Sequence, residues 1–220
     1  MIVTLDGPAA AGKGTISRLF AMKTKMVHVD VGLIFRSAAY AVQRGIVNKL
    51  SDVTALYQDK RLAYYWDDSA GSSVILDGED VAKNLYRPEI ASFASSLAAC
   101  EANLTLLNEL VREIVQDSPS AVCDGRHNGT GIFPEAEFKF FVTADVEVRA
   151  SRRTKDLQAR GHPAVYEDVL KDLRERDGRD FGRLFCPLKV PEGAVIIDTG
   201  MLSVDESVTL MCQTILGQQV

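Results

Sequence analysis

Short runs of apolar residues alternate along the chain with longer segments in which apolar residues recur at helical spacing. The runs fall at residues 2–5, 26–29, 121–123, 138–142 and 194–197. The segments 9–22, 33–44, 146–160, 164–178 and 204–216 predict helices, the first of them preceded by a loop. Strands that are buried on both faces of a parallel sheet are apolar along their whole length. The alternation therefore predicts an α/β fold in three layers, with a central five-stranded parallel sheet flanked by helices.

Residues 51–115 have a different pattern. Residues 51–60 predict a short helix, and residues 62–66 and 73–76 predict two strands joined by a turn at 69–72. Pro88 can begin a helix, and apolar residues at 104, 107, 111, 114 and 115 form one stripe of a long helix. This part of the chain predicts a small antiparallel β insertion with helices around it.

Composition narrows the possible partners. The chain has 220 residues and a net charge of −5, and its length suits one domain with insertions. A general nucleic-acid binder usually has a strongly basic balance, so we expect no nucleic-acid partner. No apolar run approaches the ~18 residues that span a bilayer, and from the opening residues we expect no secretion signal. The four cysteines form no CxxC pair and are expected to be ordinary thiols. We therefore expect a cytoplasmic protein without a membrane partner.

The segment that follows the first apolar run has the spacing of a phosphate-binding loop. Gly7-Pro8-Ala9-Ala10-Ala11-Gly12-Lys13 fits the pattern GxxxxGK, and Gly14 and Thr15 follow it. Small residues let backbone N–H groups approach phosphate oxygens, and the next helix adds its positive N-terminal end. Lys13 supplies a mobile charge for the outer phosphates. Thr15 is the candidate hydroxyl on the metal side.

Further segments carry a resemblance to one family. They are Asp30–Arg36, Leu76–Val81, Ala94-Ser95, Asp124–Thr130 and Glu175–Arg183. In order and in spacing, and together with the GKGT loop, they resemble bacterial cytidylate kinases, which are P-loop nucleoside monophosphate kinases. The resemblance covers nearly the whole chain. It implies ATP-dependent phosphorylation of CMP or dCMP to CDP or dCDP, with ATP and Mg²⁺ as cofactors and small nucleotides as partners.

The resemblance also implies roles for individual residues. The implied catalytic residues are Lys13, Asp30, Arg126 and Arg176. The implied ATP-binding residues are Gly7, Pro8, Ala9, Ala10, Ala11, Gly12, Lys13, Gly14, Thr15, Arg152 and Arg153. The implied acceptor-binding residues are Arg36, Ser95, Arg126, His127, Arg176, Asp180 and Arg183. Thr15 would bind Mg²⁺ with the ATP phosphates, and Asp30 would act through water. In this family the chain is a single kinase domain over residues 1–220, usually monomeric, with a monophosphate-binding insertion at about 36–100 and a lid at about 148–164.

Four positions depart from the family's pattern. Val31 stands where the family has Ser or Thr, Phe35 where it has Tyr, His127 where it has Asp, and Leu104 where it has an arginine that reaches the base. Positions 31, 104 and 127 belong to the nucleobase end, whereas the phosphate arginines are present. Two alternatives therefore stay open: a kinase of the same fold for another nucleoside monophosphate or small phosphate compound, and a non-catalytic nucleotide-binding protein.

Overall fold

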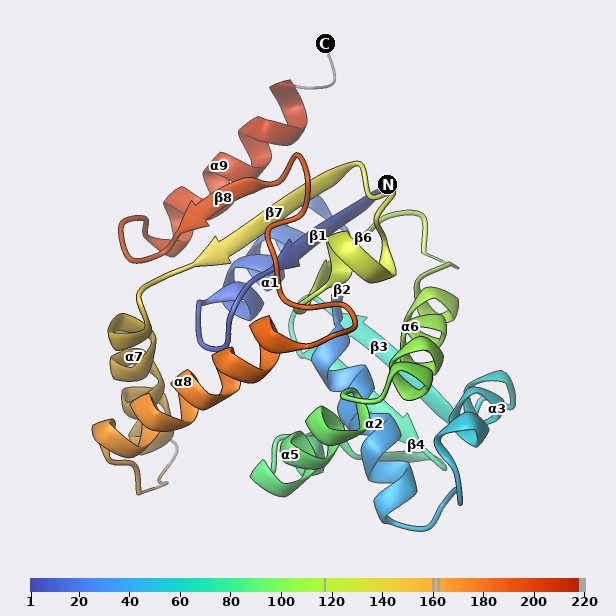
Figure 1. Cartoon of the computed structure of the whole chain (residues 1–220). Helices are drawn as coiled ribbons and strands as arrows, with labels where there is room; N and C mark the ends of the chain where they lie inside the picture. Colours follow the sequence, from blue (N-terminus) through green and yellow to red (C-terminus); the bar gives the residue numbers. More distant parts are fainter. Residues whose placement is uncertain (117, 160, 162, 218–220) are drawn as a thin grey trace.

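Five strands form the parallel sheet at the centre of the protein, for which a computed structural model describes all residues except 117, 160, 162 and 218–220 (Figure 1). They are β1 (Ile2–Asp6), β2 (Val27–Asp30), β6 (Ala121–Asp124), β7 (Phe138–Thr143) and β8 (Val195–Asp198). The strand order is β2-β6-β1-β7-β8, and every neighbouring pair is parallel. The predicted five-stranded parallel sheet is confirmed.

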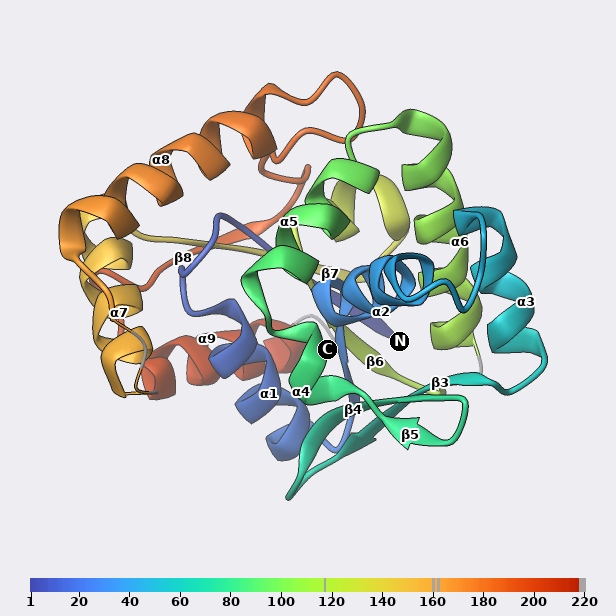
Figure 2. The ribbon, with the colours of Figure 1, turned by 90° about the horizontal axis from the view of Figure 1, so that it is seen from below.

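Helices cover both faces of this sheet, because side chains along a buried strand alternate between the faces. On β6, Val122 packs with α1 (Lys13–Thr24) and α9 (Val204–Gly217). Its neighbours Ala121 and Cys123 pack with α2 (Val31–Gln43) and α6 (Glu101–Gln116) on the other face. Figures 1 and 2 show the resulting three layers from two directions.

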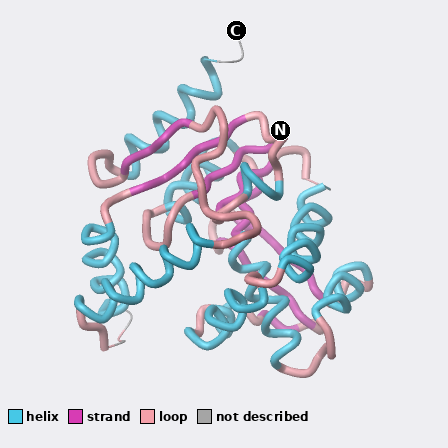
Figure 3. Tube along the Cα trace, in the orientation of Figure 1, coloured by secondary structure: helices cyan, strands magenta, loops and turns pink. Residues whose placement is uncertain are grey.

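The segment between α2 and α6 forms the predicted insertion. Its elements are the 3₁₀ turn η1 (Leu50–Asp52), α3 (Val53–Gln58), β3 (Leu62–Asp67), β4 (Gly71–Leu76), β5 (Glu79–Asp80), α4 (Ala82–Leu85) and α5 (Pro88–Leu97). Strands β3 and β4 pair antiparallel as the sequence predicts, from Leu62↔Leu76 to Asp67↔Gly71. The two-residue strand β5 adds a third strand that the sequence pattern did not indicate. Strands of both sheets stand out in magenta in Figure 3.

No single helix among the described residues is long and apolar enough to cross a membrane. One pair, Glu89–Leu97 with Glu101–Gln116, reaches the necessary length and hydropathy only when taken together, and the two helices are bent by 107°. The apolar stripe of the second helix is buried in the core, at Leu104, Leu107 and Val111 among others.

A second helical unit consists of α7 (Val146–Ala159) and α8 (Tyr166–Gly182), which pack against each other. Figure 1 shows this pair at the lower left and strands β3 and β4 at the lower right. Ala9 joins the pair's small apolar cluster with Ala150, Val169 and Leu173, so the unit is anchored on the loop after β1. Residues 160 and 162 of the expected lid lie outside the described residues.

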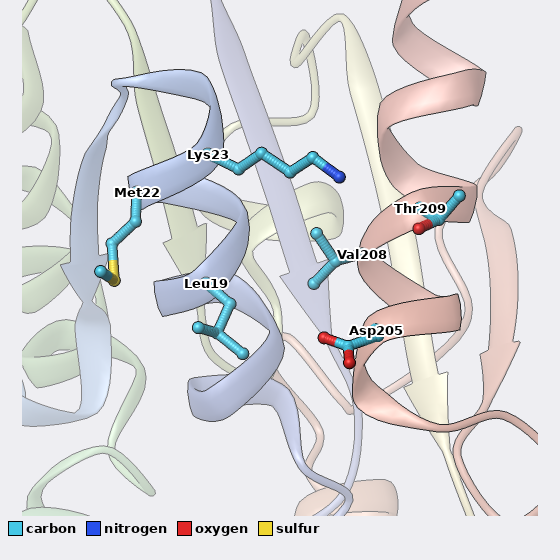
Figure 4. A pocket seen from close by; sticks show the side chains of 6 residues that line it. All are labelled: Leu19, Met22, Lys23, Asp205, Val208 and Thr209. Atoms are coloured by element: carbon cyan, nitrogen blue, oxygen red, sulfur yellow. The ribbon is translucent and has the colours of Figure 1, made fainter.

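A cavity of about 470 Å³ lies between α1 and α9. Figure 4 shows its lining, with Leu19, Met22 and Lys23 from α1 and Asp205, Val208 and Thr209 from α9. Leu19 lies six residues after Lys13, which is about 9 Å along the helix axis. This cavity is therefore separate from the loop that the sequence assigns to phosphate binding.

Substitution of Gly7 tests how tightly β1 and β7 fix the start of that loop. A Cβ atom at Gly7 would lie 1.9 Å from Val142 O, and its φ of +148° is one that side chains rarely adopt. We expect Gly7→Ala to lower the free energy of unfolding by at least about 3 kcal/mol, measured by chemical denaturation. In the control Gly178→Ala, nothing lies within 4 Å of the new Cβ, and alanine should stabilise α8 by up to about 1 kcal/mol. Equal stability of Gly7→Ala and the wild type would contradict this account.

Candidate active site

The loop between β1 and α1 leads to a lysine, Lys13, that is buried and has a lowered pKa. Its backbone has positive φ at Gly7, Ala10 and Gly12. The Lys13 side chain is buried and donates a hydrogen bond from Nζ to Pro8 O at 2.7 Å. Burial lowers the pKa of Lys13 well below its usual value, and the nearby positive charge of Arg126 lowers it further. An anion in the loop would relieve both effects.

Three aspartates end the strands beside this loop: Asp6 on β1, Asp124 on β6 and Asp30 on β2. Parallel pairing aligns Leu5 with Asp124 and Asp124 with Asp30, so the carboxylates share one edge of the sheet. Asp6 is fully buried and accepts hydrogen bonds from the backbone N–H groups of Asn128 and Gly129 at 2.8 and 2.7 Å. Burial raises the pKa of Asp6 to about 6 despite these bonds. Asp6 therefore anchors the turn that follows β6.

Asp30 is engaged by α2. One oxygen accepts a hydrogen bond from Leu33 N at 2.8 Å and caps the helix, and the other lies 3.2 Å from Arg36 Nη2. Asp30 thereby orients Arg36, one of the arginines expected at the acceptor phosphate.

Asp124 was not among the site residues inferred from the sequence, although it ends a strand next to β1. Its Oδ1 atom lies 2.7 Å from His28 Nε2, and its Oδ2 atom lies 4.0 Å from the position of a Cβ built on Gly14. Burial opposes the charge, but the hydrogen bond from His28 and the charge of Lys13 together hold the pKa of Asp124 below its usual value. The structure thus places an ionised carboxylate at the start of α1.

The expected acceptor arginines converge near Lys13. Arg126 donates from Nε to Asp180 Oδ2 at 3.0 Å, and Arg183 donates to Asp180 Oδ1 at 2.7 Å. The charge of Arg126, followed by burial, lowers the pKa of Arg176 to about 10, and Arg36 contributes to the same effect. One carboxylate thus compensates two arginines, while Arg176 lies among like charges. The cluster is suited to an anion that carries several charges.

The basic residues of α7 differ in their contacts. Arg152, expected at ATP, donates to the hydroxyl and carbonyl oxygens of Thr199 at 2.9 and 2.6 Å. Thr199 in turn donates to Ala11 O of the loop at 3.0 Å. Arg153 is half-exposed and pairs with Asp156 at 3.2 Å, while its charge still reaches Arg176.

Arg149 of α7 has a structural role that the sequence did not distinguish from the other basic residues of this helix. It is buried and donates to Ala144 O, Ala9 O and Asp177 Oδ2 at 2.9, 3.0 and 2.6 Å. These bonds join α7 and α8 to the loop after β1. The sequence signal was its place as the first basic residue of the helix, but spacing alone does not distinguish an anchor from a solvent-facing charge.

The expected base end is closed around His127, which is buried. Its Nε2 atom lies 2.9 Å from Asn108 Oδ1, and an amide oxygen only accepts, so Nε2 carries the hydrogen. Nδ1 has no partner among the described residues. The Phe35 ring lies edge-on at 6.2 Å, and Leu104 is part of the core. Ser95 on α5 is partly exposed.

The comparisons with known proteins agree with one another. The family model described as cytidylate kinase matches residues 3–216. A curated cytidylate kinase of Rhodospirillum rubrum is 36% identical over 214 residues, covering 95% of this chain and 94% of the relative. One from Aeromonas salmonicida is 37% identical over 206 residues, covering 93% and 89%.

The chain belongs to the cytidylate kinase family.

Solved structures support the fold more broadly. Shikimate kinases from Bacteroides thetaiotaomicron and Acinetobacter baumannii are 13% and 14% identical, each with a TM-score of 0.50. The alignments cover 99% and 100% of this chain and 98% and 94% of those chains. At this identity the likeness concerns the three-layer kinase fold alone.

The residues beside the loop fit the magnesium ion that a cytidylate kinase implies. Mg²⁺ prefers oxygen ligands and usually combines one or two carboxylates with phosphates and water. Thr15 is an exposed residue in the first turn of α1, and the second oxygen of Asp124 lies on the side of Gly14. No group of three or more His, Cys, Asp or Glu side chains suited to a metal occurs among the described residues.

Removal of the Lys13 charge should separate stability from activity. We expect Lys13→Met to lower the rate of phosphoryl transfer at least about 100-fold, because the outer phosphates lose a cation. In buffer without phosphate or other polyvalent anions, the same change should raise Tm by about 2–4 °C, because it removes a buried charge and its repulsion from Arg126 and Arg176. Thermal unfolding with and without inorganic phosphate measures the second effect. A Tm below that of the wild type in both buffers would contradict it.

His127 predicts a pH dependence of stability. Burial, with the charge of Arg183, lowers the pKa of His127 from 6.5 to about 4. His127 is therefore protonated below about pH 6.5 in the unfolded chain but only below about pH 4 in the folded chain. The free energy of unfolding decreases as the pH falls through this range. The full effect is about 3 kcal/mol.

We expect His127→Gln to lose less stability than the wild type between pH 7 and pH 4, as measured by urea unfolding. Other groups titrate in both proteins, so the difference between the two curves isolates His127. Parallel curves would show that His127 does not resist protonation.

Proposed function

We propose that this protein transfers the γ-phosphoryl group of ATP to CMP or dCMP, forming ADP and CDP or dCDP. The observation that carries the proposal is the convergence of Lys13, Arg36, Arg126 and Arg176 on one edge of the sheet, in a chain of the cytidylate kinase family. Phosphoryl transfer requires positioning and charge neutralisation more than covalent chemistry by the protein.

The donor end would be the loop Gly7–Lys13 with Gly14 and Thr15. Its backbone N–H groups and Lys13 would bind the ATP phosphates. Thr15 and Asp124 would hold the magnesium ion, with Asp30 acting through water, and the ion would neutralise charge on the β- and γ-phosphates. We assign Arg153 to the donor phosphates, whereas Arg152 would reach them by way of the Thr199 contact that it makes here.

The acceptor end would use three arginines and a fixed carboxylate. Arg36, Arg126 and Arg176 would bind the monophosphate, and guanidinium groups suit this task because they bind phosphate through two parallel hydrogen bonds. Asp180 accepts hydrogen bonds from Arg126 and Arg183 and would hold both guanidinium groups in place, with Arg183 on the nucleoside side. The remaining base-side residues in this assignment are Ser95 and His127. An oxygen of the acceptor phosphate would attack the γ-phosphorus while the arginines offset the repulsion between the two anions.

We also propose the domain roles that the resemblance implies. Residues of about 36–100 would carry the monophosphate, and residues of about 148–164 would act as a lid over the donor phosphates. Closure would exclude water and strengthen the contacts between charges. In this proposal the kinase acts as a cytoplasmic monomer in pyrimidine nucleotide metabolism.

Acceptor preference is the direct test of this function. ADP formation should be measured with ATP and Mg²⁺ against CMP, dCMP, UMP, dUMP, AMP, GMP and dTMP. We expect the highest kcat/KM with CMP or dCMP, at least about tenfold above UMP, because a buried polar site rejects a base that leaves its groups unpaired. Higher turnover with another monophosphate would instead assign the altered base end, with Leu104 and His127, to a different acceptor. Tight CMP binding without ADP formation would indicate a nucleotide-binding protein.

A further inference from the structure

We propose that His28 is a positioning residue for phosphoryl transfer, which holds the Asp124 carboxylate so that its free oxygen faces the donor phosphates and their magnesium ion. This inference rests on the proposed kinase function. His28 lies on β2, two residues before Asp30, and belongs to none of the segments that indicated the family.

The geometry around Asp124 distinguishes its two oxygens. Oδ1 lies 2.7 Å from His28 Nε2 and 3.2 Å from the Ser17 hydroxyl, and the hydroxyl and Nε2 are 2.9 Å apart. A carboxylate only accepts hydrogen bonds, so Nε2 carries a hydrogen toward Oδ1. Oδ2 remains on the side of Gly14, at the start of α1. Two donors thus occupy one oxygen and leave the other for the nucleotide side.

His28 is itself fixed from the β insertion. The Ser72 hydroxyl lies 3.3 Å from His28 Nδ1, and the Tyr64 hydroxyl lies 2.7 Å from Ser72 Oγ and 3.0 Å from His28 O. The Trp66 ring meets the imidazole edge-on at a centroid distance of 4.9 Å. All three side chains come from β3 and β4, so the hairpin sets the orientation of the ring that holds Asp124.

Burial makes this arrangement consequential. His28 and Ser17 are 5% and 0% exposed, so water does not replace either donor at Oδ1. A buried carboxylate that loses its hydrogen-bond donors must rotate or take up a proton to satisfy its oxygens. Either change removes the oriented oxygen that a magnesium-bound nucleotide would meet. The role differs from packing, because it depends on an N–H donor at one position of the ring.

The test compares His28→Leu, which removes the donor, with His28→Gln, whose amide can donate to Oδ1. The readout is the dissociation constant of ADP by calorimetry, with and without Mg²⁺. We expect the gain in ADP affinity from Mg²⁺ to shrink about tenfold in His28→Leu, with metal-free ADP binding unchanged, and to be largely retained in His28→Gln. The KM for CMP should stay close to that of the wild type while kcat falls.

Ser17→Ala and Ser207→Ala form a matched pair. Both serines are 0% exposed, but the Ser207 hydroxyl donates to Ser203 O, the residue before α9, instead of to Asp124. Ser17→Ala should weaken the effect of Mg²⁺ on ADP binding by about two- to fivefold, whereas Ser207→Ala should change only Tm. The Ser17 variant also tests the proposal if His28→Leu fails to fold.

An unchanged effect of Mg²⁺ in His28→Leu, or in Ser17→Ala, would overturn the inference. Equal losses of ADP affinity with and without Mg²⁺ would overturn it as well, because they would show a structural role. Binding of ADP does not require an acceptor, so these outcomes remain distinct from failure of the acceptor panel to identify CMP.

Discussion

The concentration of positive charge at the carboxyl edge of the sheet is the constraint on which the rest of this structure depends. Lys13 is buried with a lowered pKa, and Arg176 is held among other arginines. Neither arrangement favours the folded chain in the absence of an anion. Functional sites commonly retain such unfavourable charges because a ligand compensates them. Here the compensation would come from phosphate groups, and the stability of the empty protein is lower for it.

Rigid attachments keep these charges in place. Asp6 holds the turn after β6, Asp180 holds two arginines, and Arg149 ties the α7–α8 pair to the carbonyl of Ala9. Each attachment pairs a buried charged group with several partners, which is the condition under which a buried ion is tolerated.

The two ends of the site have diverged from the family's pattern to different degrees. The phosphate end keeps the lysine and arginines that the proposed phosphoryl transfer would use. At the base end, Leu104 of α6 is part of the core. His127 forms a hydrogen bond with Asn108, which also lies on α6. A neutral, buried imidazole and an amide can read hydrogen-bond donors or acceptors, whereas a carboxylate only accepts. Acceptor preference is thus the property in which this kinase has most freedom to differ from its relatives.

The sequence by itself determined the elements, the phosphate loop and the family. Burial repeats over two residues in a strand and over 3.6 in a helix, so this information is local, and the hairpin β3–β4 and the parallel sheet followed from it. Arg36, Arg126 and Arg176 were assigned to the acceptor phosphate from their motifs, and this assignment stays a prediction. The third strand, β5, was not predicted, because two residues are too few to show a periodic pattern.

Only the tertiary structure decided how the side chains pair. Asp124 meets a histidine 96 residues away, Arg149 meets a carbonyl 140 residues away, and Arg126 meets an aspartate 54 residues away. No spacing in the chain encodes these contacts, because they depend on how strands are ordered within the sheet and on which helix face meets the loop. The sequence therefore indicated which chemical groups the site contains. Tertiary packing determines which charged side chains are paired within the protein and which are available to a substrate.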